Sequence, residues 1–202
     1  MYVTSPSGIS VHRIYCTTQS AKYRLACFPH FTDAPLDFHR LSGLLLPGVE
    51  TLAFQYIGSL PDGTPAHIRD VEDLADQALR TLLEWTDLPL ALFGHRSGAY
   101  LALRVAERLE EEYGFGLASL FVADRAAPHE VGHEEGRQVG CRVVALTGVP
   151  SQRAEPDAVG AWRNVTTGPF DLEAFRGMNG YLDYSSSEVA NLIHDQLLSL
   201  PL

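Results

Sequence analysis

The stretch GHRSG (residues 94–98) has the spacing of a turn that presents a catalytic nucleophile. It stands between an apolar run typical of a buried strand and a pattern typical of a helix. In the related pattern G-x-S-x-G, the two small residues let strand and helix approach closely, and the central serine attacks an acyl carbon. Gly94 and Gly98 keep this frame, but Arg96 occupies its centre. A guanidinium cannot be that nucleophile, so the sequence retains the turn without its usual chemistry.

Arg96 has two interpretations. In the functional one, a fixed cation stands where helix N–H groups point, and a carboxylate or a phosphate can bind there. In the structural one, Arg96 covers a vacated pocket and pairs with a local acid such as Asp33 or Asp124. Both stay open, and the structural one is favoured because cations near apolar walls usually find internal partners.

Ser97 is the neighbouring hydroxyl and a second candidate for the nucleophile. Centring the frame on Ser97 would put His95 and Ala99 at the small-residue positions, and His95 is too large for close packing. A serine also needs a general base within hydrogen-bond reach. His30 and His95 would lie nearby, but no acid partner is evident for either. We therefore expect Ser97 to begin the helix and to offer its N–H as half of an oxyanion hole.

The motif HEVGH (residues 129–133) matches the zinc-binding pattern H-E-x-x-H. On a helix, His129 and His133 would share one face and bind the metal, with Glu130 as general base. Pro128 directly precedes the motif and leaves no room for upstream helical turns. The motif also lies in a short connection between two predicted strands. We expect a solvated loop there, and neither a metal nor another cofactor.

The predicted elements place the GHRSG turn at the edge of a sheet. Apolar runs that mostly lack polar alternation indicate strands buried on both faces, and they occur at 24–28, 50–56, 88–94, 117–123, 141–148 and, more weakly, 170–175. Apolar positions at three-to-four spacing predict helices over 70–85, 97–114 and 185–200. Strands alternating with helices favour a mostly parallel sheet covered on both faces. Such sheets bind ligands at the carboxyl ends of their strands.

Composition narrows the class of protein. A length of 202 residues predicts a single domain (1–202), and 46% hydrophobic residues fit a globular core. The net charge of −10 disfavours nucleic acid, because phosphate binding needs a basic surface. No run approaches the roughly 18 apolar residues of a membrane helix, and the first residues lack the pattern of a signal peptide. We expect a cytoplasmic protein that does not bind membranes.

Several stretches resemble one family and follow the same order along the chain. They are LACFPHF (25–31), LAFQYIG (52–58), LADQALRTLL (74–83), LALFGHRSGAYLALRVAERLE (90–110) and AWRNVTTGPFDLEAFRG (161–177). Together they resemble the stand-alone type II thioesterases of polyketide and nonribosomal peptide synthesis. The resemblance implies an α/β-hydrolase fold, and hydrolysis of acyl groups stalled on carrier proteins by a Ser–His–Asp triad with an oxyanion hole.

The resemblance, taken position by position, implies that the catalytic triad is degenerate. The family's serine matches Arg96, its aspartate matches Ser151 and its histidine matches Asn179. The oxyanion loop, Pro-His-Ala-Gly-Gly in the family, is here the bulkier PHFTDAP (29–35). The family's helical lid corresponds to the short connection 124–140. Most of the lid is therefore predicted to be missing.

These observations predict a three-layer α/β-hydrolase sandwich with its lid largely deleted. The predicted function is that of a catalytically inactive thioesterase-like protein of a secondary-metabolite (antibiotic) pathway. It would bind a biosynthetic enzyme, a carrier protein, or an acyl or anionic intermediate, through candidates at the old pocket: His30, Phe31, His95, Arg96, Ser97 and Asn179. The alternatives are a reprogrammed cyclase or isomerase that uses Arg96, a residual acyl-thioester hydrolase and a zinc hydrolase. Lid loss would expose an apolar patch, which predicts a homodimer or heteromeric contact.

Overall fold

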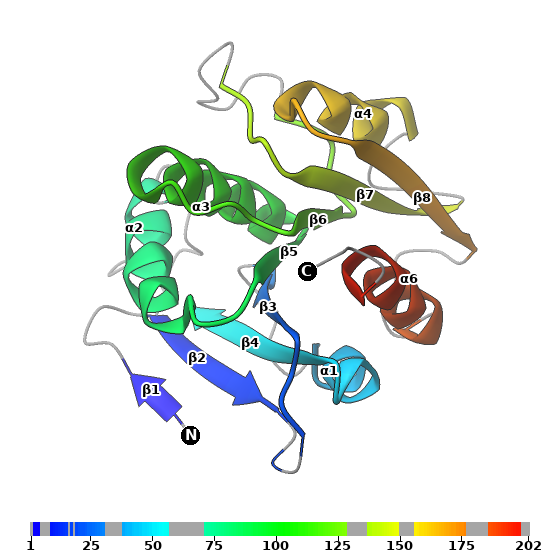
Figure 1. Cartoon of the computed structure of the whole chain (residues 1–202). Helices are drawn as coiled ribbons and strands as arrows, with labels where there is room; N and C mark the ends of the chain where they lie inside the picture. The colour runs from blue at the N-terminus through cyan, green and yellow to red at the C-terminus, as the bar shows by residue number, and fades with distance from the viewer. Residues whose placement is uncertain are drawn as a thin grey trace, which may run out of the picture.

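An eight-stranded, mostly parallel sheet forms the centre of the described structure (Figure 1). The computed structural model describes residues 2–4, 9–15, 17, 19–30, 38–56, 71–128, 137–149, 156–176 and 186–198. The strands are β1 (Tyr2–Thr4), β2 (Ile9–Ile14), β3 (Tyr23–Phe28), β4 (Val49–Tyr56), β5 (Leu90–His95), β6 (Ser119–Ala123), β7 (Arg142–Val149) and β8 (Phe170–Arg176). Their order is β1-β2-β4-β3-β5-β6-β7-β8. The β1/β2 and β2/β4 pairs are antiparallel, and the others are parallel.

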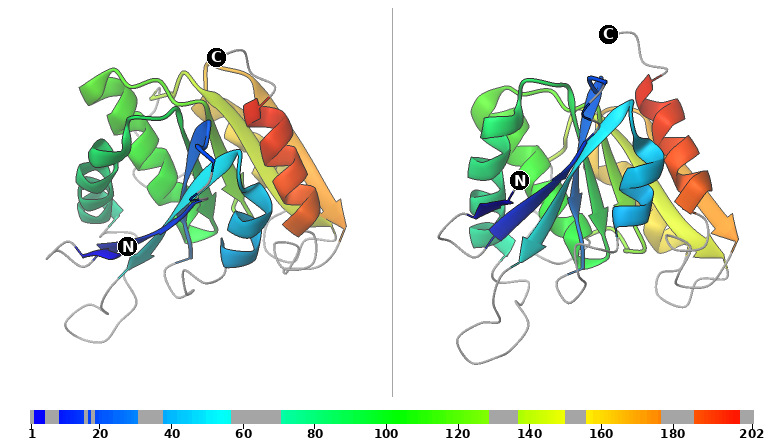
Figure 2. Two further views of the ribbon diagram at one scale, coloured as in Figure 1. Left: turned by 60° about the horizontal axis from the view of Figure 1, so that its bottom comes forward. Right: turned by 90° about the horizontal axis from the view of Figure 1, so that it is seen from below.

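Helices cover both faces of this sheet (Figure 2). One face carries α2 (Val71–Leu82) with the 3-10 turn η3 (Leu83–Trp85), α3 (Ser97–Tyr113), α4 (Pro156–Gly160) and the 3-10 turn η4 (Ala161–Val165). The other face carries α1 (His39–Leu45) and α6 (Ser186–Leu198), which pack against each other. The three-layer α/β fold predicted from the sequence is therefore confirmed. None of the described helices is long and apolar enough to cross a membrane.

The central strands alternate their side chains between two hydrophobic cores. In β3, Ala26 faces the core under α2 and α3, whereas Leu25 and Cys27 face the core under α1 and α6. In β5, Leu92 and Phe93 divide in the same way. Because both faces are covered, these strands carry apolar residues at consecutive positions. This explains why unbroken apolar runs predicted them.

The helix α3 connects the GHRSG turn to the second layer. It begins at Ser97, directly after β5, and most of its inward-facing side chains are fully buried. Gly114 ends it in the left-handed conformation, with φ 61°, and donates its N–H to the Glu110 carbonyl at 3.1 Å. Its outer face is joined to α2 by ion pairs such as Arg104 with Glu72, at 2.7 Å. The helix is thus fixed at both ends and along its length.

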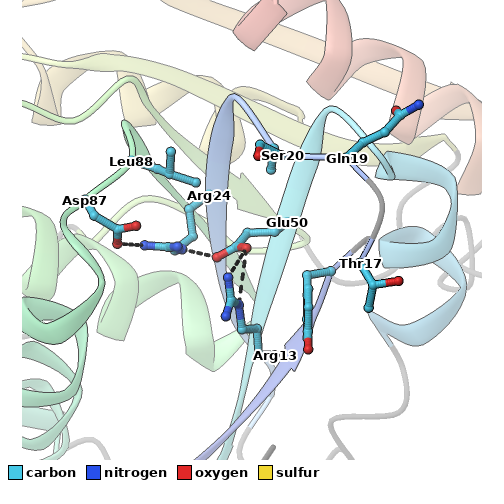
Figure 3. A pocket seen from close by; sticks show the side chains of 10 residues that line it. Arg13, Thr17, Gln19, Ser20, Arg24, Glu50, Asp87 and Leu88 are labelled. Atoms are coloured by element: carbon cyan, nitrogen blue, oxygen red, sulfur yellow. Dashed lines mark hydrogen bonds and ion pairs between the residues drawn. The ribbon is translucent and has the colours of Figure 1, made fainter.

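Four charged side chains join neighbouring strands near the amino-terminal edge of the parallel sheet (Figure 3). Arg24 of β3 donates to Glu50 of β4 and, through Nη1, to Asp87 just before β5 at 2.5 Å. Glu50 also accepts from Nη2 of Arg13 in β2, at 2.7 Å. Arg24 and Glu50 are only 1% and 3% exposed. Each charge has lost its hydration on burial, and its ion-pair partner must offset that loss. These ion pairs, called here the charge chain, link the adjacent strands β2, β4 and β3 to the segment that precedes β5.

Acid should weaken the charge chain at Asp87. The hydrogen bond from Arg24 lowers the pKa of Asp87 below its ordinary value of 3.8. A carboxyl group whose pKa is lower in the folded state stabilises the fold fully above its unfolded pKa, and this stability is lost as pH falls through the folded pKa. The melting temperature of the wild type should therefore fall as the pH drops below about 4. In Asp87→Asn this fall should be smaller, because the titrating carboxyl group has been removed.

Thermal melts in an acid pH series measure this effect. Asp195→Asn, on the exposed side of α6, is the matched control and should leave the acid decline unchanged. The same decline in the wild type and in Asp87→Asn would contradict the prediction.

Candidate active site

The turn between β5 and α3 has the strained backbone of a nucleophile elbow. Arg96, at its apex, has φ 52° and ψ −115°, a conformation that residues with a side chain rarely adopt. Its N–H donates to the Ala123 carbonyl at 2.8 Å, and its own carbonyl accepts from the Ala99 N–H at 3.1 Å. The neighbouring strand and the first turn of the helix therefore hold the elbow in place, even with an arginine at the apex.

The two glycines of the elbow are required by close backbone contacts. A Cβ atom on Gly94 would lie 2.4 Å from the Ala99 Cα, and one on Gly98 would lie 2.1 Å from the Phe28 carbonyl oxygen. Neither distance can accommodate a methyl group. The expectation that Gly94 and Gly98 let strand and helix approach closely is confirmed.

Ser97 begins α3, as expected, and its hydroxyl contacts His30. The distance between His30 Nδ1 and Ser97 Oγ is 2.5 Å. His30 follows β3, which pairs in parallel with β5, so both residues come from the carboxyl ends of adjacent strands. Ser97 is buried and His30 is half-buried. The structure thus gives the serine next to the elbow apex a base within hydrogen-bond reach.

His95 and Asp124 form a second pair beside the elbow. His95 Nε2 and Asp124 Oδ2 are 3.6 Å apart, and both side chains are buried. The pair follows from strand register, because His95 lies opposite Ala123 in the parallel β5/β6 pair. Asp124 itself has a positive φ of 54° and donates its N–H to the Leu146 carbonyl at 3.0 Å. The sequence made no acid partner of His95 evident, and the structure places Asp124 beside it.

Asp124 also bears on the structural interpretation of Arg96. Within the described residues, its ion pair is with His95 and not with Arg96. The proposed Arg96–Asp124 pair is therefore wrong, because the register of β5 and β6 turns the carboxylate toward the imidazole. The other suggested partner, Asp33, lies outside the described residues.

Tyr56 is a residue of this region that sequence reasoning missed. Its hydroxyl donates to the Pro29 carbonyl at 3.3 Å and so supports the segment that carries His30. Burial raises the pKa of Tyr56 well above its ordinary value, which keeps the phenol protonated as a donor. The feature that could have pointed to Tyr56 is its position at the end of β4, the strand that pairs with β3.

Several predicted site residues lie outside the described residues. These are Phe31, two of the three vestigial triad positions and the zinc motif: Ser151, Asn179, His129, Glu130 and His133. The replaced triad, the missing lid over 124–140 and the status of the HEVGH motif therefore stay predictions. In the part of the chain that is described, no three His, Cys, Asp or Glu side chains gather in a way that could hold a metal ion.

Comparisons with known proteins agree with the fold. Residues 23–149 match the family described as "Thioesterase domain". The chain is 29% identical to Thioesterase PikA5 of Streptomyces venezuelae, over 95% of this chain and 86% of that protein. It is 26% identical to the probable cadicidin biosynthesis thioesterase of Streptomyces griseus, over 90% of this chain and 65% of that protein.

A solved structure shows the same overall similarity. The type II thioesterase BorB from the borrelidin biosynthetic cluster superposes with a TM-score of 0.79 and 26% identity. The superposition covers 97% of this chain and 98% of BorB. Since the family match alone spans more than half of the 202 residues, this chain belongs to the thioesterase domain family.

Proposed function

We propose that this protein cleaves acyl thioesters in a secondary-metabolite pathway, with Ser97 and His30 as its reacting pair. The observation that carries the proposal is the 2.5 Å contact between the Ser97 hydroxyl and the His30 imidazole. Membership of the thioesterase domain family supports a thioester as the bond that is cleaved. The relatives are named for cadicidin biosynthesis and for the borrelidin biosynthetic cluster, which supports a polyketide or nonribosomal peptide pathway.

The proposed chemistry is an acyl transfer through Ser97. His30 accepts the hydroxyl proton as Ser97 attacks the thioester carbonyl, and the protonated imidazole then returns a proton to the leaving thiolate. A water molecule, activated by the same imidazole, releases the acid from the acyl-serine. The positive end of the 17-residue helix α3 lies at Ser97 and favours the oxyanion that forms. Because Ser97 stands one residue past the apex, we expect a slow enzyme.

Arg96 supplies a binding function in this proposal. Its backbone is held at the elbow apex, and it directly precedes Ser97 in the chain. A guanidinium binds the oxygens of a phosphate or carboxylate in a bidentate manner. The phosphate of a carrier protein's phosphopantetheine arm, or an acidic group on the acyl chain, would bind there.

A second candidate function is the one predicted from the sequence, that of an inactive protein that binds its partner or an intermediate. The observation that favours it is Arg96 at the position where a working elbow carries serine. In that case the elbow would hold an acyl or anionic group without reacting with it, and the protein would assist a biosynthetic enzyme.

Hydrolysis of an acyl-N-acetylcysteamine thioester separates the two candidates. The proposal expects measurable turnover that Ser97→Ala lowers by about 100-fold or more, because the nucleophile is removed. The control is Ser42→Ala, a buried serine of α1 whose hydroxyl donates to the Phe38 carbonyl. Ser42→Ala should retain turnover. Turnover that survives Ser97→Ala would overturn Ser97 as nucleophile, and absence of turnover with retained thioester binding would select the second candidate.

A further inference from the structure

A polar cavity of about 340 Å³ opens near the amino-terminal edge of the parallel sheet (Figure 3). Its wall includes Arg24 near the start of β3, Glu50 near the start of β4 and Asp87 shortly before β5. The elbow lies at the other end of β5, beyond Gly94. A strand of six residues separates the two ends by about 20 Å. The cavity is therefore distinct from the site around Ser97.

Arg13 presents a fixed hydrogen-bond donor to this cavity. Its Nε and Nη2 atoms both donate to Glu50, at 3.2 and 2.7 Å. Its guanidinium lies over the Tyr15 ring at 4.4 Å and over the Trp85 ring at 5.1 Å. The remaining nitrogen, Nη1, makes no hydrogen bond to any residue in the described part of the chain, and the side chain is 32% exposed. The held guanidinium thus keeps one donor available for a ligand.

The charges around the cavity select the kind of anion that it would hold. Arg13 and Arg24 carry two positive charges, and Glu50 and Asp87 carry two negative ones, so the charge chain is neutral as a whole. A monoanion can pair with the outer edge of Arg13. A phosphate dianion would face repulsion from both carboxylates at short range. The balance favours a carboxylate over a phosphate.

The remaining walls offer neutral and acidic partners for a second ligand group. Thr17, Gln19 and Ser20 line the cavity, and their side chains make no hydrogen bonds to other described residues. Asp87 has a side chain that is 70% exposed, and Arg24 binds its Oδ1 atom. Its other oxygen can accept a hydrogen bond from an ammonium or a hydroxyl group. Thr17, Gln19, Ser20 and Asp87 thus offer acceptors for the donor group of a ligand whose carboxylate pairs with Arg13.

We propose that this cavity binds a small monocarboxylate that carries a hydrogen-bond donor, which is the chemistry shared by amino acids and hydroxy acids. The carboxylate pairs with Arg13 Nη1, and the ammonium or hydroxyl group donates to an acceptor on the rest of the wall, such as the Thr17 hydroxyl. The volume lies in the range of small-molecule sites. This binding is independent of thioester cleavage at Ser97.

Calorimetric titration of the full chain with L-alanine and L-lactate tests the proposal. We expect saturable one-to-one binding of at least one of them with a Kd near or below about 1 mM. Acetate, which lacks the donor, and inorganic phosphate should bind at least about tenfold more weakly. Absence of saturable binding for both probes, or tighter binding of phosphate, would overturn the proposal.

Variants assign the binding to this cavity. Arg13→Lys keeps a cation beside Glu50 but removes the outer nitrogen, and should weaken binding about tenfold or more. Thr17→Val leaves the charge chain intact and serves if Arg13→Lys does not fold; it should weaken binding several-fold. Arg80→Gln, an exposed arginine of α2, and Ser97→Ala should both retain full affinity. Unchanged affinity in Arg13→Lys and Thr17→Val would place the ligand elsewhere and reject the assignment.

Discussion

Gly98→Ala is expected to prevent stable folding. The new methyl group would lie 2.1 Å from the Phe28 carbonyl oxygen and 2.6 Å from the Pro29 carbonyl oxygen. Neither atom can move away easily, because β3 is paired on both sides, with β4 and with β5. We expect a loss of more than about 4 kcal/mol in the free energy of unfolding, the range reserved for severe steric or burial defects. Soluble yield and a urea unfolding curve measure it.

Gly43→Ala is the matched control for this substitution. Gly43 lies within α1, and a Cβ atom added there would meet nothing within 4 Å. Alanine has the higher helix propensity, so this variant should gain about 0.5 to 1 kcal/mol. Equal stability of the Gly98 and Gly43 variants would mean that β3 and α3 are not held in contact as described.

Glu50→Gln should be the most damaging single change in the charge chain. Both carboxylate oxygens of Glu50 accept from arginines, and the residue is 3% exposed. Neutralising it leaves the buried Arg24 with Asp87 as its remaining ion-pair partner, and Asp87 lies at the surface. Removing one partner of a buried ion pair typically costs about 3 to 5 kcal/mol. In a chain of this size that corresponds to a fall of roughly 6 to 20 °C in melting temperature.

The same substitution at Glu72 gives the comparison. Glu72 also pairs with two arginines, Arg104 and Arg108, but its side chain is 50% exposed on the outer face of α2. Solvent screens such pairs, so Glu72→Gln should cost at most about 1 kcal/mol. Calorimetric melts of both variants at neutral pH test the difference. A similar fall in melting temperature for Glu50→Gln and Glu72→Gln would show that burial does not determine how much the charge chain stabilises the fold.

The sequence predicted the strands that are buried on both faces more reliably than it predicted the rest. Their unbroken apolar runs have one physical cause, burial between two helical layers, and β3 to β7 fall close to the predicted ranges. The edge strand β8, whose side chains are half-buried or exposed, was predicted from a weaker pattern. The strand β2 was not predicted, because its apolar residues, such as Ile9 and Val11, alternate with polar ones. The helix α1 was not predicted either, because seven residues are too few to establish a helical period.

The candidate site was predictable only where local spacing determines it. The GHRSG spacing predicted the elbow because Gly94 packs against Gly98 and Ala99, which are close in sequence. The contact of Gly98 with Phe28 joins distant residues and was not predictable in this way. The contacts of His30 with Ser97 and of His95 with Asp124 depend on the register between separate strands, which no local pattern encodes. Knowing that β5 and β6 are neighbours would have identified Asp124, because it directly follows the residue opposite His95.

The two tryptophans lie in different parts of the fold, so their intrinsic fluorescence can report on each part separately. Trp85 lies 5.1 Å from the guanidinium groups of both Arg13 and Arg24, so its indole senses the charges around the cavity. Trp162 is fully buried on the α3 side and donates to the Arg125 carbonyl. Since the chain contains only these two indoles, replacing either one with phenylalanine leaves a single fluorophore. Emission from Trp85 alone would then follow events at the amino-terminal edge of the sheet, and emission from Trp162 alone would follow the integrity of the core.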